Sequence, residues 1–81
     1  MSEVRFKAGE VIFRQAYPAD YAYVIKSGRV EIYKENSDGS EEHIVILEPG
    51  QMFGELGVLD DAPRSASARA VDDVILQIMN L

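Results

Sequence analysis

The residues best suited to chemistry lie in one glycine-containing segment, residues 50–70. Gly54 and Glu55 come early in this segment, and Arg64 and Ser65 follow near its end. Glycine has no Cβ, so the backbone at Gly54 can approach a ligand closely. A guanidinium can bind a phosphate through two parallel hydrogen bonds, whereas an ionised carboxylate only accepts them. The set therefore suits a ligand that carries a compact anion beside a hydroxyl, such as a nucleotide with a free ribose 2′-hydroxyl.

The local structure expected around these residues supports the same chemistry. Residues 55–59 can form about one helical turn, and Pro63 ends any helix. Free backbone amides at the start of such a turn attract an anion. Arg64 has small neighbours, Ser65 and Ala66, which leave room for a ligand. We interpret the segment as an insert that binds phosphate and sugar and that interrupts the strands of the surrounding fold.

The rest of the chain predicts short strands separated by turns. The strands are expected at residues 10–14, 21–26, 29–34, 43–47, 67–70 and 74–79. Turn signals every eight to twelve residues or so favour an all-β sandwich or barrel. We therefore predict one domain, residues 1–81, that folds as a jelly-roll-like double-sheet sandwich of about eight short strands with one short helix.

Two details of the strand pattern can be checked directly. Ser27 and Gly28 predict a two-residue hairpin turn between the strands at 21–26 and 29–34, because glycine supplies a positive φ at no steric cost. Within the second of these strands, side chains alternate between two faces. One face is expected to carry Val30 and Ile32, and the other Arg29, Glu31 and Tyr33.

Composition excludes several classes of function. The chain has 81 residues, with 8 Lys and Arg against 14 Asp and Glu, a net charge of −6, one His and no Cys. Net acidity argues against direct nucleic-acid binding. A disulfide framework or a thiolate zinc site needs Cys, and a lone His43 is not a metal centre. No apolar run is long enough for membrane insertion, and the N-terminus lacks a signal-peptide pattern, so we expect a cytoplasmic domain.

The order of residues in the segment also resembles a known family. Two stretches, Phe53-Gly54-Glu55-Leu56 and Pro63-Arg64-Ser65-Ala66, resemble the phosphate-binding cassette of cyclic nucleotide-binding domains. We refer to residues 53–66 as the cassette. The residues at 9–13, 20–28 and 47–50 are similar to the strands and turns of that family at the right spacing. The resemblance covers nearly the whole chain.

The resemblance implies a role for each residue of the cassette. Glu55 would bind the ribose 2′-hydroxyl, and Arg64 the exocyclic oxygens of the cyclic phosphate. The remaining contacts would come from Phe53, from the amides of Gly54, Leu56 and Ala66, and from the Ser65 hydroxyl. Ile32 and Ile44 would line the base pocket. The expected ligand is a 3′,5′-cyclic nucleotide, with cAMP favoured over cGMP, and no cofactor or metal is expected.

Two departures from the family pattern bear on these expectations. Ala16 stands where the family usually has glycine, which would cost about 1 kcal/mol if a positive φ is needed there. The family also has an N-terminal helix and C-terminal lid helices, whereas this sequence ends at residues 80–81, in or just after the last predicted strand. Without a lid, the base-side opening is expected to expose apolar surface, which favours a homodimer.

Three kinds of function remain open from the sequence. The first is a regulatory sensor that binds a cyclic nucleotide, catalyses no reaction and controls an attached or partner effector whose identity the sequence leaves unknown. The second is a structural or interaction module that keeps the fold without a ligand. The third is a cupin-type jelly-roll enzyme, which ranks lowest because its metal site usually needs two or three His.

Overall fold

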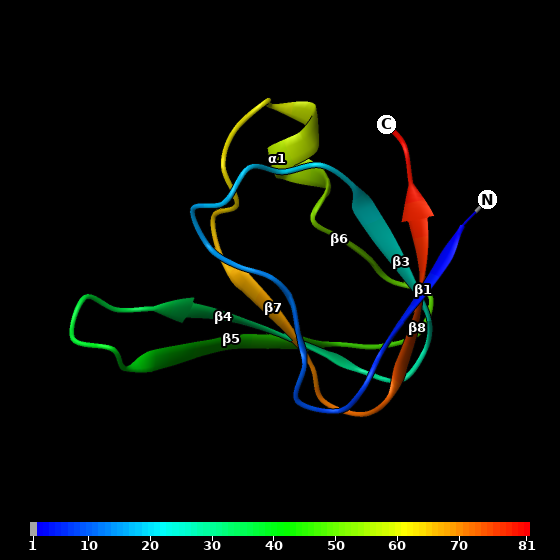
Figure 1. Cartoon of the computed structure of the whole chain (residues 1–81), viewed down its shortest axis with the longest axis horizontal. Coiled ribbons are helices and arrows are strands. Elements are labelled where there is room, and N and C mark those ends of the chain that lie inside the picture. The colour runs from blue at the N-terminus through cyan, green and yellow to red at the C-terminus, as the bar shows by residue number, and fades with distance from the viewer. Residues whose placement is uncertain (1) are drawn as a thin grey trace.

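Residues 2–81, which the computed structural model describes, form two antiparallel four-stranded sheets and one short helix (Figure 1). In chain order the elements are β1 (Glu3–Phe6), β2 (Val11–Phe13), β3 (Ala22–Ser27), β4 (Val30–Glu35), β5 (Glu41–Leu47), β6 (Met52–Phe53), α1 (Glu55–Leu59), β7 (Ser67–Ala70) and β8 (Val74–Met79). The strand orders are β1-β8-β3-β6 and β2-β7-β4-β5. The predicted all-β double-sheet sandwich with one short helix is confirmed.

The core forms where alternate residues of the two sheets face one another. Because side chains alternate along a strand, every second residue of a half-buried strand points inward. Ala68 and Ala70 do so from β7, and Val74 and Leu76 from β8, and all four are almost fully buried. Other members of the same cluster are Tyr23, Ile25, Val30 and Phe53.

The sequence pattern located most strands to within a residue or two. The ranges predicted for α1, β7 and β8 agree with the structure, and β5 begins two residues earlier than predicted. Two short edge strands, β1 and β6, were not predicted. β1 alternates polar and apolar residues over only four positions, and β6 has only two residues, so both are too short to stand out in the sequence.

The turn at Ser27 and Gly28 does not form the predicted hairpin. The strands on either side of it, β3 and β4, lie in different sheets, so this turn carries the chain from one sheet to the other. Gly28 has a φ of 82°, and a Cβ there would lie 2.4 Å from the Asp73 carbonyl oxygen. The glycine is needed for this close approach as well as for the turn. A turn signal predicts a reversal of the chain but not the sheet that the next strand joins.

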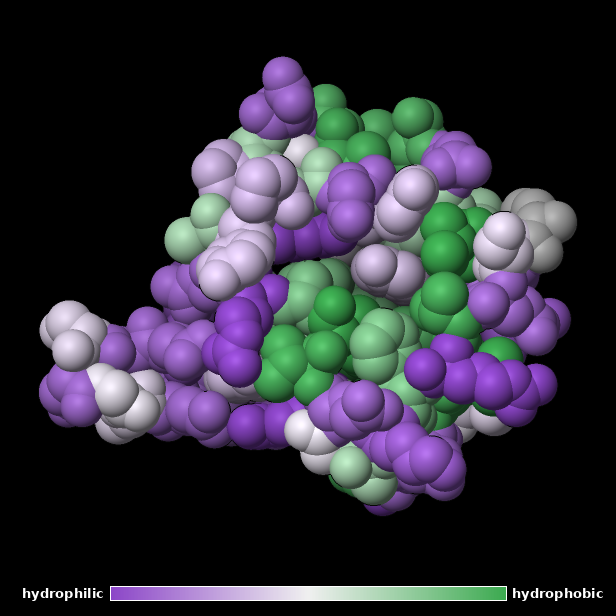
Figure 2. Space-filling view, viewed as in Figure 1, coloured by the Kyte–Doolittle hydropathy of each residue, from purple (hydrophilic) through white to green (hydrophobic). Residues whose placement is uncertain are grey.

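The outer face of β4 carries a charged layer above a buried ring. Glu31 and Tyr33 lie on this face, as predicted, opposite Arg69 and Ser67 of β7. The Arg69 guanidinium lies 4.2 Å from the centroid of the Tyr33 ring and forms ion pairs with Glu31 and Glu41. These contacts fasten the β4–β5 hairpin, which projects from the body as a hydrophilic arm (Figures 1 and 2).

The loop between β2 and β3, residues 14–21, is paired with the cassette. The amide of Ala16 donates to the Arg64 carbonyl at 2.8 Å, and the amide of Arg64 donates to the Tyr17 carbonyl at 2.9 Å. Pro18 and Pro63 form an isolated bridge beside them. Ala16 adopts a φ of 73°, so the residue that replaces the family's glycine does occupy the left-handed region. The β2–β3 loop, which lies far from the cassette in sequence, therefore fixes the backbone of Arg64.

None of the helices among residues 2–81 has the length and apolar character needed to cross a lipid bilayer.

Candidate functional site

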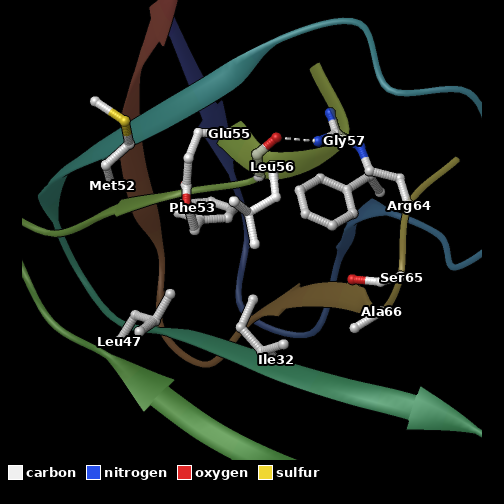
Figure 3. A pocket seen from close by; sticks show the side chains of 12 residues that line it. Ile32, Leu47, Met52, Phe53, Glu55, Leu56, Gly57, Arg64, Ser65 and Ala66 are labelled. Carbon is white, nitrogen blue, oxygen red and sulfur yellow. Dashed lines mark hydrogen bonds between the residues drawn. The ribbon is translucent and has the colours of Figure 1, made fainter. Parts of the chain in front are cut away.

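A cavity of about 230 Å³ lies between the cassette and the inner face of β4 and β5 (Figure 3). Its lining residues are Phe13, Ile32, Leu47, Met52, Phe53, Gly54, Glu55, Leu56, Gly57, Arg64, Ser65 and Ala66. All the site residues predicted from the sequence are among them except Ile44. The volume is below the roughly 300–1,000 Å³ of most small-molecule pockets, so a nucleotide here would remain partly exposed.

Ile44 is not brought to this cavity, in contrast to the prediction. The register between β4 and β5 shifts between Ile32 and Tyr33, so that Ile32 faces Val45 while Tyr33 faces His43. Ile44 is the extra residue of this bulge, and 46% of its surface is exposed. Leu47, further along the same strand, lines the cavity instead. A bulge changes which residues of a strand point inward, and nothing in the local sequence marks its position.

Arg64 is a buried cation held by three residues from two parts of the chain, Gly54 in the cassette and the adjacent pair Asp20 and Tyr21. Only 2% of its side-chain surface is exposed. Its Nη1 donates to the Gly54 carbonyl at 2.6 Å, and its Nη2 donates to the Tyr21 carbonyl at 2.6 Å. Nη2 also lies 3.2 Å from Oδ1 of Asp20, a side chain that is 68% exposed. One exposed carboxylate offsets the charge of a buried guanidinium only in part, so the site favours an additional anion.

Two side chains that line the cavity each have a buried polar atom without a hydrogen-bond partner among residues 2–81. These atoms are Nε of Arg64 and Oε2 of Glu55. A buried polar atom without a partner is costly, and such atoms in folded proteins commonly meet a water or a ligand. One of these atoms is a donor on a cation, and the other is an acceptor on a carboxyl group. A small shift of these side chains would bring the donor and the acceptor to a ligand that offers an anionic oxygen at one point and a hydroxyl at another.

Gly54 allows the cassette to close over Arg64. The residue precedes α1 with a φ of 79°. A Cβ at this position would lie 2.8 Å from Nη1 of Arg64 and 3.2 Å from Cε2 of Phe13. Both the backbone conformation and the packing therefore require glycine. Its carbonyl then reaches the guanidinium, as the dashed line in Figure 3 shows.

The other end of the cavity is apolar. Ile32 and Leu47 face Glu55 and Leu56 across it, and Ser65 and Ala66 line a further side (Figure 3). The side chains of Ile32, Leu47 and Leu56 have no hydrogen-bonding groups. This end can therefore hold a flat ring through apolar contacts but offers few side-chain partners to the edge of that ring.

A stack of aromatic rings supports the cavity from within the sandwich. Tyr23 and Phe53 stack with their centroids 5.4 Å apart, and Phe13 lies 5.9 Å from Phe53. Burial, followed by the nearby charge of Asp20, raises the pKa of Tyr23 above its ordinary value. Tyr23 is therefore a neutral member of the core at physiological pH.

Four lining residues were not identified from the sequence: Phe13, Leu47, Met52 and Gly57. Phe13 and Leu47 belong to predicted strands, where an apolar residue is expected to fill the core. Met52 comes just before the cassette and has no polar group to suggest a role. Only the packing of the two sheets shows that these side chains reach the cavity.

A larger cavity, of about 330 Å³, lies elsewhere on the molecule but lacks the features of the first. It is lined by Arg5, Phe6, Lys7, Ser27, Asp73, Val74 and Ile75. Both buried side-chain atoms that lack partners within residues 2–81 belong to the first cavity. The charged side chains around the second cavity are exposed to solvent. The first cavity is therefore the better candidate despite its smaller volume.

No group of three or more His, Cys, Asp or Glu side chains able to hold a metal ion occurs within residues 2–81. The cupin-type alternative depends on such a group.

Comparisons with known proteins identify relatives of this chain. A family model described as the cyclic nucleotide-binding domain matches residues 3–80. An uncharacterised ABC transporter ATP-binding protein of Mycobacterium tuberculosis is 49% identical over 70 residues, which cover 86% of this chain and 21% of that protein. A CRP-like cAMP-activated global transcriptional regulator of the same species is 38% identical over 74 residues, covering 91% of this chain and 33% of the regulator. The chain therefore spans about a fifth (21%) of the length of the first curated relatives.

Solved structures show the same likeness in three dimensions. The EAL enzyme Bd1971 in its cAMP-bound form superposes with a TM-score of 0.94 at 39% identity, over 98% of this chain and 21% of the enzyme. Its cGMP-bound form superposes with a TM-score of 0.92 at the same 39% identity, and the coverage is again 98% and 21%.

Proposed function

The chain belongs to the cyclic nucleotide-binding domain family, and we propose that it binds a 3′,5′-cyclic nucleotide in the cavity beneath the cassette. The observation that carries this proposal is the pair of unpartnered buried atoms, Arg64 Nε and Glu55 Oε2, on one cavity. A cyclic nucleotide supplies an anionic phosphate oxygen and a 2′-hydroxyl within one small molecule. The ligand is bound and released unchanged, because a sensor needs no reaction at its site.

Arg64 and its neighbours form the phosphate end of the proposed site. The guanidinium is buried and already oriented by Gly54, Tyr21 and Asp20, so little conformational entropy is lost when it takes a phosphate oxygen. The Ser65 hydroxyl and the backbone amides of Gly54, Leu56 and Ala66 complete the cradle, and Phe53 packs against it from the core.

Glu55 forms the ribose end. Its Oε2 is buried and has no partner within the described residues. A ligand hydroxyl is the donor that such an oxygen needs, and a hydrogen bond to a charged group is worth about 1.5–3 kcal/mol. The same carboxylate repels a second phosphate, which favours a cyclic phosphodiester over a nucleotide with a free terminal phosphate.

The base lies at the apolar end, where we propose that adenine is preferred to guanine. Ile32, Leu47 and Leu56 can pack against either ring. Guanine presents more polar edge atoms than adenine, and each one left without a partner costs free energy. We therefore propose that cAMP binds more tightly than cGMP.

The domain acts as a regulatory module for another part of the same protein or for a partner. A relative described as cAMP-activated matches this chain over only a third of its length, so the comparable region there is one part of a larger protein. Ligand binding can shift an effector only if the ligand binds two arrangements of the module with different affinity. The contact between the cassette and the β2–β3 loop is the place where such arrangements would differ.

A second copy of the chain is the partner that we propose for the apolar surface near the cassette. Met52, Leu56 and Leu59 are 42%, 65% and 63% exposed, respectively. A patch of this kind commonly marks an interaction surface. Light scattering at high protein concentration tests this point, and a monomeric mass would contradict it.

An alternative function is that of a structural module that keeps the fold without a ligand. The short hydrogen bonds from Arg64 to the Gly54 and Tyr21 carbonyls favour it, because they give the guanidinium a role in holding the fold. Calorimetric titration with cAMP and cGMP distinguishes the two functions. The proposal expects saturable binding below millimolar concentration, with cAMP the tighter ligand. Absence of binding by both nucleotides would leave the structural module.

A further inference from the structure

We propose that Phe13 is a positioning residue for the phosphate end of the site: its ring holds the plane of the Arg64 guanidinium. The Cζ of Arg64 lies 4.0 Å from the centroid of the Phe13 ring. This inference rests on the proposed function, since it assumes that the guanidinium meets an anionic ligand. Phe13 comes from β2, an element far from the cassette in sequence, and it lines the same cavity.

The hydrogen bonds of Arg64 hold its two amino groups but leave its flat faces free. Nη1 is held by the Gly54 carbonyl, and Nη2 by the Tyr21 carbonyl. A planar fork binds an anion well only when its plane is correctly tilted, because both N–H groups must point at the acceptor. A ring against one face fixes that tilt and keeps water away from the face. Its negative π-surface also attracts the cation, more strongly when the cation is desolvated.

Phe13 is itself rigid enough for this task. Its ring is stacked on Tyr23 at an interplanar angle of 24° and contacts Phe53. Its Cε2 lies 3.2 Å from the point where a Cβ of residue 54 would be, so the cassette covers the ring closely. The guanidinium is thus the last layer of an ordered stack, and its unpartnered Nε remains for the ligand.

The shape of the Phe13 ring and its charge distribution have different consequences for ligand binding. If Phe13 only fills space, a ring of nearly the same shape should serve equally well. If its π-surface positions the guanidinium, weakening that surface should reduce affinity for an anionic ligand. Affinity for a ligand without the phosphate should not change.

The test replaces Phe13 with 3,4,5-trifluorophenylalanine, which nearly keeps the ring's shape but removes most of its negative face. Binding of cAMP is measured by calorimetry, and binding of adenosine by chemical-shift titration. We expect cAMP affinity to fall by roughly three- to tenfold while adenosine affinity stays at the wild-type value. The same replacement at Phe6, a partly buried ring that does not line this cavity, is the matched control and should change neither affinity.

A double-mutant cycle gives a second readout that fold stability alone would not change. In an Arg64→Gln background the cation is absent, so trifluorination of Phe13 should no longer reduce cAMP affinity. Unchanged cAMP affinity in the trifluorinated protein, or an equal loss for cAMP and adenosine, would overturn the inference and leave the proposed function intact. Failure of the wild-type protein to bind cAMP would instead remove the proposed function, and this inference with it.

Discussion

The carbonyl of Gly54 accepts a hydrogen bond of 2.6 Å from Nη1 of Arg64, which joins the start of the cassette to its end. This contact closes the loop that contains α1 and places the guanidinium on the same cavity as Glu55. It also explains why residue 54 is glycine, since a Cβ there would lie 2.8 Å from the donor atom. The backbone conformation at Gly54 therefore decides where the guanidinium lies.

Gly54→Ala should reduce both stability and ligand affinity. A side chain at a φ of 79° costs about 1–2 kcal/mol, and the new methyl group would also displace the guanidinium. We expect cAMP affinity to fall at least about tenfold, which corresponds to ~1.4 kcal/mol. Gly39→Ala is the matched control, because Gly39 has a φ of 88° but no atom within 4 Å of the added Cβ. That variant should lose stability and keep wild-type affinity, as measured by urea unfolding and calorimetry. Equal affinity in both variants would argue against the contact.

Glu55→Gln should weaken the recognition of the ribose. The substitution keeps the shape of the side chain but removes its charge, and so weakens the acceptor that a 2′-hydroxyl would meet. We expect cAMP affinity to fall roughly tenfold, or ~1.4 kcal/mol, and affinity for 2′-deoxy-cAMP to change much less. The exposed residue Glu48 supplies a control, since Glu48→Gln makes the same chemical change away from the cavity. If the variant at position 55 still discriminates against the deoxy ligand as wild type does, Glu55 does not bind the ribose.

Ala16→Gly should stabilise the fold. Ala16 and Asp61 are the non-glycine residues with positive φ within residues 2–81. Relief of about 1–2 kcal/mol of backbone strain is offset in part by the greater freedom of glycine in the unfolded chain. The free energy of unfolding should therefore rise by about 0.5–1 kcal/mol, measured by urea denaturation. Ala8→Gly, at a residue without positive φ, should lower it instead. A loss of stability in both variants would contradict this account.

Acid sensitivity should depend on Arg69. Hydrogen bonds from Arg69 and then from His43 lower the pKa of Glu31 below its ordinary value of 4.5. The unfolded chain thus binds a proton at a pH where folded Glu31 does not. This contribution to stability is complete above the ordinary pKa and is lost as the pH falls through the lowered one.

Arg69→Gln should therefore make the loss of stability at acid pH less steep. We expect the variant to be less stable than wild type by about 1 kcal/mol near neutral pH, with a smaller difference at pH values below the pKa of folded Glu31. Urea unfolding across a pH series measures both effects. The control is Arg29→Gln, which breaks the more exposed ion pair with Asp72. A difference from wild type that does not vary with pH would show that Arg69 acts only by packing on Tyr33.

The sequence predicted the fold and most residues that line the candidate cavity because both depend on local patterns. Alternating apolar residues and turn residues locate the strands, and the cassette residues lie close together in the chain. Gly54, Glu55 and Arg64 lie on one cavity because a short loop joins them. The types and spacing of these residues are therefore enough to indicate the chemistry of the site.

The features that were missed or misplaced depend on contacts between distant parts of the chain. Ile44 lies in a bulge that alternation cannot predict, and the turn at Gly28 crosses between sheets instead of forming a hairpin. Phe13 has the sequence signature of an ordinary strand residue. Only the packing of β2 against the cassette shows that its ring lies against Arg64.

Arg64 is proposed to bind the phosphate of a cyclic nucleotide as a planar fork. The most direct test compares the cAMP affinity of wild type and Arg64→Lys by calorimetry, with the exposed Arg14→Lys as the matched control. Lysine keeps the charge but loses the two parallel donors. We predict one site per chain in wild type and Arg14→Lys, and an affinity at least about 30-fold lower in Arg64→Lys, equivalent to ~2 kcal/mol. Equal affinity in all three proteins, or no binding by wild type, would contradict the account.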